Sequence, residues 1–157
     1  MDSSNPYEAP ASAVVDAQQD ATRRLFRTSA IYIATFMGST LAGGWVLAMN
    51  HEALGQFDLA RKARWSGLIA AVAIVALTLV LPERIPGMVF LIPQMVAASY
   101  WLKRTPQGEA IAARVAAGLP MRSNWAAAGI GLLCALVQLA VLGLVAVAAI
   151  YGFGMEL

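Results

Sequence analysis

The sequence predicts an all-α integral membrane protein, a four-helix bundle with a short amphipathic helix between the third and fourth spans. Two observations carry this prediction. The chain of 157 residues is 59% hydrophobic and only 13% charged, whereas soluble domains average about 45–50% apolar and about 25% charged residues. Its apolar residues also fall into blocks close to the roughly 20 residues that a helix needs to cross the hydrocarbon layer.

The segment 1–20 is rich in Ser, Pro, Ala and acidic residues and predicts a flexible polar tail, because it has too little apolar surface to offset the entropy of ordering. A secretory signal peptide has a short basic start and an apolar core. The tail has neither, so we expect the first apolar block to stay in the mature protein. The remainder, 21–157, is expected to form one membrane domain.

Four apolar blocks predict the spans, at about 28–49, 65–81, 86–103 and 125–151. Arginine, lysine, tryptophan and tyrosine border them, as expected of side chains that anchor helices at the head groups. Gly55 is suited to a left-handed turn after the first helix, and Pro82 ends the second. The segment 107–117 has apolar residues four apart and predicts a short helix, closed by Gly118, that either lies on the membrane surface or caps the bundle.

Four crossings would place both termini on one side of the membrane. The longer loops then carry Arg61, Lys62, Arg64, Lys103, Arg104, Arg114 and Arg122, and the opposite side carries Arg23, Arg24, Arg27 and Arg84. The positive-inside rule favours cytoplasmic loops by a small margin, because the three arginines before the first span oppose it.

Two glutamines fall near the middle of predicted spans, Gln94 in the third and Gln138 in the fourth. An amide facing lipid has no water to bond, so both should face protein. We expect the two side chains to form a hydrogen-bonded pair near the bilayer midplane, beside a bend at Pro93. They either join the helices or line a small polar pocket, and the sequence leaves both functions open.

Small residues are concentrated in the first span, at Gly38, Ser39, Gly43 and Gly44. Small side chains at helical spacing let helix backbones approach closely, and such packing drives association in lipid. This surface packs either inside the bundle, against Gly67 or Gly131, or against another membrane protein or a second copy.

No charged residue lies deep inside an apolar block, although proton relays and ion-coupled transport usually need one. His51 and Glu52 are adjacent and point about 100° apart on a helix, so they predict a solvated helix end rather than a catalytic dyad. Cys134 is the only cysteine and is expected to be a packing residue. We therefore expect no catalytic residue, metal site or cofactor, and the net charge of +2 gives no indication of nucleic-acid binding.

The run LAGGWVLAMNHEALGQFDLARKARWSG resembles a loose group of uncharacterised bacterial multi-pass inner-membrane proteins. In that group a Gly-Gly transmembrane helix leads into an Asn-x-x-x-Leu-Gly corner, here at Gly43, Gly44, Asn50, Leu54 and Gly55. The segment NPYEAP resembles the tail of many small bacterial membrane proteins. The resemblance implies a location in the bacterial cytoplasmic membrane and no activity.

Two classes of function follow from the sequence. The first is a non-enzymatic membrane protein that binds a partner protein, as a scaffold, a subunit or an immunity protein. The alternative is a channel or carrier for a small neutral solute that uses the polar cluster of Gln94 and Gln138. A cavity reaching both amides would favour the carrier, whereas tight packing around them would favour the partner-binding protein.

Overall fold

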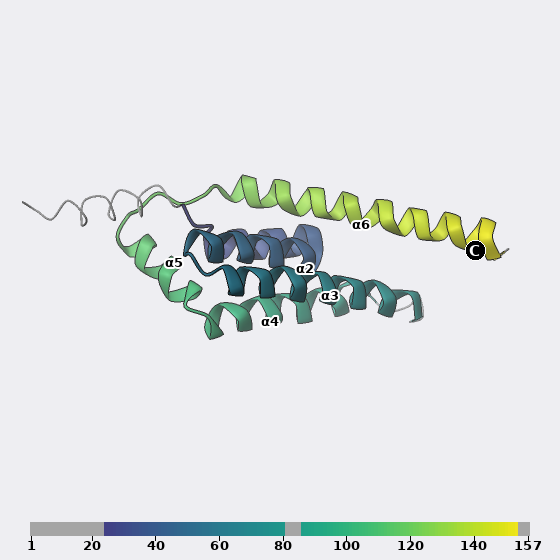
Figure 1. The fold of residues 1–157 in the computed structure, drawn as a ribbon, viewed down its shortest axis with the longest axis horizontal. Helices are drawn as coiled ribbons and strands as arrows, with labels where there is room; N and C mark the ends of the chain where they lie inside the picture. The colour runs from purple at the N-terminus through teal and green to yellow at the C-terminus, as the bar shows by residue number, and fades with distance from the viewer. Residues whose placement is uncertain (1–23, 81–85, 154–157) are drawn as a thin grey trace, which may run out of the picture.

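The computed structural model describes residues 24–80 and 86–153 and contains, in that part of the chain, helices and no strand (Figure 1). The helices are α2 (Thr28–Ala53), α3 (Phe57–Val80), α4 (Met88–Arg104), α5 (Gln107–Ala116) and α6 (Asn124–Phe153). The all-α prediction is confirmed. The tail predicted over 1–20, the end of the second span at Pro82, and Arg84 lie outside the described residues.

The helix α2 is a hairpin, and this differs from the straight helix predicted over 28–49. Its backbone leaves helical geometry at Gly38 and Ser39. The chain then returns, so that the backbone N–H of Phe26 donates to Asn50 Oδ1 at 2.7 Å and Asn50 Nδ2 donates to the Phe26 carbonyl at 3.0 Å. In a straight helix, residues 28 and 50 would be about 33 Å apart. We call Gly38–Ser39 the tip, 28–37 the first arm and 40–53 the second arm.

The hairpin is the centre of the fold, and α3, α4 and α6 pack on it from different sides. Among the described residues, these three helices make no extensive contact with one another. The largest fully buried side chains include Phe26, Ile31 and Val46, which lie on the hairpin or just before it. Figure 1 shows that α3 and α6 continue well past the tip of α2.

The short connections follow the predicted turn chemistry. Gly55 and Gly118 both adopt a left-handed backbone, with φ of 74° and 65°, as expected of glycines that end helices. Ser123 Oγ accepts a hydrogen bond from the backbone N–H of Trp125 at 3.2 Å and so caps the start of α6. Arg122 N–H donates to the Leu25 carbonyl at 2.8 Å, which places the start of α6 beside the start of α2.

Two of the described helices are apolar and long enough, by length and composition, to cross a membrane: Thr28–Ala53 and the Asn124–Ala148 part of α6. They differ in burial, since 56% of the apolar window is buried in the first and 6% in the second. The first is folded in two, and its longer arm, 40–53, measures only about 21 Å at 1.5 Å per residue. Length along the chain therefore overstates the distance that α2 covers.

Candidate functional site

The tip of the α2 hairpin holds the most strained residue of the described chain. Ser39 has φ of 62° and ψ of −169° and is the one described residue other than glycine with a positive φ. That region of backbone space is essentially restricted to glycine and costs about 1–3 kcal/mol, so it persists only where the surroundings hold it. The Ser39 hydroxyl oxygen is buried and has no hydrogen-bond partner within the described residues.

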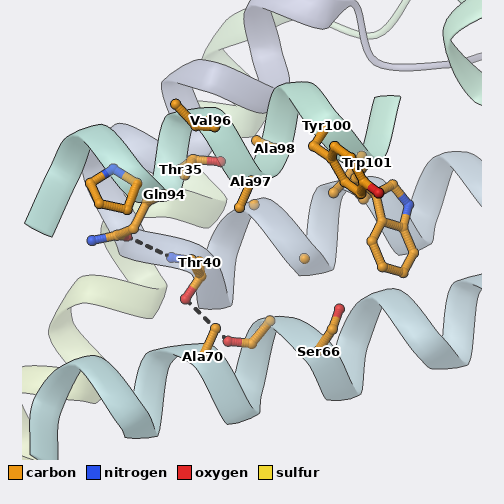
Figure 2. Close-up of a pocket in the computed structure, with 15 residues that line it drawn as sticks. Thr35, Thr40, Ser66, Ala70, Gln94, Val96, Ala97, Ala98, Tyr100 and Trp101 are labelled. Atoms are coloured by element: carbon orange, nitrogen blue, oxygen red, sulfur yellow. Dashed lines mark hydrogen bonds between the residues drawn. The ribbon is translucent and has the colours of Figure 1, made fainter. Parts of the chain in front are cut away.

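Gln94 and Gln138 hold this tip from two sides. Gln138 Nε2 donates to the Gly38 carbonyl at 3.0 Å. Gln94 Oε1 accepts from the backbone N–H of Thr40 at 3.0 Å (Figure 2). The turn interrupts the ladder of helical hydrogen bonds, so one carbonyl before it and one N–H after it need other partners. The two amides supply them from α6 and α4.

The prediction that these two glutamines bond to each other is therefore wrong. Both side chains face protein, but each one binds the α2 backbone instead of the other amide. Their remaining donors bond within their own helices, from Gln94 to the Phe90 carbonyl at 2.9 Å and from Gln138 to the Cys134 carbonyl at 3.2 Å. The helix α4 continues through Pro93 from Met88 to Arg104, and a bend there stays a prediction.

The glycines of α2 lie inside the described fold. A Cβ added to Gly38 would lie 2.9 Å from Gly131 Cα of α6, and one added to Gly44 would lie 2.9 Å from Gly67 Cα of α3. A Cβ on Gly43 would collide with the Thr35 hydroxyl on the first arm. The crossing of α2 with α6, the crossing of α2 with α3 and the contact between the two arms thus depend on glycine at these positions.

A groove of about 490 Å³ opens beside the tip, between α3 and α4. The second arm of α2 forms its floor, and Figure 2 shows Ser66 and Ala70 of α3 facing Ala97 and Tyr100 of α4 across it. Gln94 borders the groove, whereas Gln138 is not among its lining residues. The groove therefore reaches one side of the tip only, and most of its wall is apolar.

The sequence prediction for His51 is wrong. Its side chain is fully buried, because the returning second arm carries it under α4. Trp101 Nε1 donates to His51 Nε2 at 3.1 Å, and His51 Nδ1 lies 2.8 Å from Gln56 Oε1. An indole N–H only donates, so Nε2 accepts and the proton of the neutral imidazole is on Nδ1. His51 connects the end of α2 to α4 and has no carboxylate partner in the described chain.

Several polar residues of this network were not predicted from the sequence. Asn50 joins the two ends of the hairpin, Thr40 Oγ1 donates to the Gly67 carbonyl at 3.2 Å, and Gln107 Nε2 donates to the Leu47 carbonyl at 3.4 Å. The sequence signal that could have indicated the hairpin is the run Gly38–Ser39–Thr40, because Gly/Ser pairs are a recognised cause of sharp helix kinks. In the part of the chain that the structure describes, no group of three His, Cys, Asp or Glu side chains is arranged to hold a metal ion.

Comparison of the chain with protein-family models, with curated proteins and with solved structures finds no match.

Proposed function

We propose that this chain is a multi-pass protein of the bacterial cytoplasmic membrane that binds another membrane protein and catalyses no reaction. In this proposal α3, α4 and α6 cross the bilayer, while the α2 hairpin enters and leaves on the same side. Non-helical backbone is tolerated at membrane depth where protein buries it, and Gln94 and Gln138 provide partners for the tip. With 17 residues, α4 is at the lower limit of about 17–25 residues for a spanning helix.

The distribution of positive charge supports this arrangement. The hairpin returns the chain to the end of the molecule where it began, because Asn50 bonds Phe26. Every lysine and arginine that the structure describes then lies at that end: before α2, in the first turns of α3, at the end of α4, in α5 and before α6. The positive-inside rule assigns this end to the cytoplasm. The excess of Lys and Arg on the cytoplasmic side is therefore larger in this topology than in the topology with four spans.

The observation that carries the partner-binding function is the bare apolar surface beyond the tip. There Val80 of α3, Leu144 of α6 and Tyr151 of α6 are 82%, 70% and 85% exposed, and the described parts of the three helices make no extensive contact with one another. Spanning helices associate by close packing of side chains. Three helices that share only a short hairpin leave this half of the bundle without a core, and a partner helix would supply it.

Photo-crosslinking in native membranes tests this function. A benzoylphenylalanine replacing Leu144 is expected to give a protein adduct of one discrete mass, which mass spectrometry then identifies. The matched control replaces Trp125, which is 86% exposed on the same helix at the basic end, and is expected to give no such adduct. Lipid adducts alone at both positions would contradict partner binding.

A carrier for a small neutral solute is the second candidate, and the groove that reaches Thr40 and Gln94 favours it. Both amide atoms of Gln94 already have protein partners, so a solute would have to displace one of them. Uptake that is lost in a Gln94→Leu variant with normal membrane levels would support the carrier.

A further inference from the structure

We propose that the groove between α3 and α4 binds an anionic phospholipid, with an acyl chain along its apolar wall and the phosphate at its basic end. This inference rests on the proposed membrane placement. It concerns a different surface from the one proposed for the partner protein, since the groove begins at the basic end and stops near the tip.

The apolar wall of the groove suits an acyl chain. Along α4 the lining residues run from Pro93 to Trp101, which is about 12 Å at 1.5 Å per residue. Thr40 and Gln94, two of the polar residues in the lining, already bond to protein groups. A hydrocarbon chain needs no hydrogen-bond partner, so it matches the chemistry of this wall.

Two cations stand at one end of the groove, one on each wall. Lys62 is one turn before Ser66 on α3, and Arg104 is one turn after Tyr100 on α4. Figure 2 shows that Ser66 lies at the same end of the groove as Tyr100 and Trp101, so the two helices are antiparallel and bring Lys62 and Arg104 to that end. The Arg104 guanidinium lies 4.9 Å from the Tyr100 ring centroid, which holds it above the groove-lining ring.

On α3, Lys62 differs from the two arginines beside it in having no carboxylate partner among the described residues. Arg61 is paired with Asp58 at 3.2 Å, and Arg64 is paired with Glu52. Within the described residues, no carboxylate lies at ion-pair distance from Lys62 or Arg104. A basic site between helices at the cytoplasmic face is typical of anionic head-group binding, and here the apolar groove continues directly from it.

Native mass spectrometry in a neutral detergent tests the site. The full chain is mixed with equal amounts of dioleoylphosphatidylglycerol and dioleoylphosphatidylcholine, which share acyl chains and differ in charge. Since each cation near the surface favours an anionic head group roughly 5-fold, we expect the phosphatidylglycerol complex to exceed the other by about 30-fold. The variant Lys62→Gln/Arg104→Gln is expected to bind both lipids equally.

The matched control, Arg27→Gln/Arg61→Gln, removes the same charge from the same end of the molecule and should keep the preference. Arg61 lies on the face of α3 opposite the groove-lining Ala70, and Arg27 lies before α2 beside the start of α6. Ala97→Trp fills the groove with an indole and should reduce the occupancy of both lipids, which also covers the case in which the double variant does not fold. An equal loss of preference in the control, or full occupancy in Ala97→Trp, would overturn the site. Alkaline extraction separates the two proposals. A chain released from membranes contradicts the proposed function, and a retained chain without lipid preference contradicts this site alone.

Discussion

At the scale of single residues, Ser39 shows how a hairpin can be forced on an unsuitable side chain. Its positive φ is strained, and its hydroxyl has no partner in the described chain, so glycine at this position would lose no hydrogen bond. We expect Ser39→Gly to raise the free energy of unfolding by about 1 kcal/mol. Reversible unfolding in mixed micelles measures it. The control, Ser29→Gly in the first turn of α2, should lower the free energy of unfolding by about 0.5 kcal/mol. A lower free energy of unfolding in both variants would contradict the strain at Ser39.

The two glutamines give a second prediction at this scale. Because Gln94 and Gln138 bond different backbone groups, their losses should be independent. Each change to leucine is expected to cost about 1 kcal/mol, and the double change should cost the sum within about 0.5 kcal/mol. A double-mutant cycle measures the coupling. A double variant that is no less stable than either single variant would instead indicate a direct hydrogen bond between the two amides.

At the scale of elements, the crossing of α2 and α3 depends on Gly44. An added Cβ would lie 2.7 Å from the Ala63 carbonyl and 2.9 Å from Gly67 Cα, and backbone atoms cannot rotate away. Gly44→Ala is therefore expected to lower the free energy of unfolding by about 1–3 kcal/mol. Gly143→Ala on α6 is the control, since a Cβ there meets no atom within 4 Å, and it should be neutral or stabilise by up to about 1 kcal/mol. Equal destabilisation by the two variants would contradict the dependence of the α2–α3 crossing on the close approach of their backbones.

What the sequence predicted among the elements depended on local signals. Gly55 and Gly118 end helices through their own backbone chemistry, so those boundaries were predicted closely. The hairpin was not predicted, because an apolar block has the same pattern whether the helix is straight or folded in two. The burial of His51 follows from the hairpin, since only a returning second arm brings it under Trp101. The partners of Gln94 and Gln138 were missed for the same reason.

At the scale of the whole molecule, the fold predicts a membrane topology that differs from four spans. In the topology that we propose, α2 returns to its own side and three helices cross, so Arg24 and Asp58 should lie on one side and Tyr151 on the other. Four spans would instead separate Arg24 from Asp58. Single cysteines at these exposed positions, in a Cys134→Ala background, can be labelled with an impermeant maleimide in intact cells. Labelling of Tyr151→Cys alone is the expected result, and opposite labelling of the other two positions would exclude the hairpin topology.

The contact between Gln138 and the Gly38 carbonyl joins residues 100 positions apart, and this has a consequence for the order of events during synthesis. The ribosome makes α2 first and α6 last, so the tip lacks its α6 partner until nearly the whole chain has emerged. In detergent micelles, a chain stopped at Met121 should therefore exchange the amide hydrogens around Ser39 faster than the complete chain, and equal exchange rates would contradict this order. The first apolar block to be synthesised is then the last to reach its final shape.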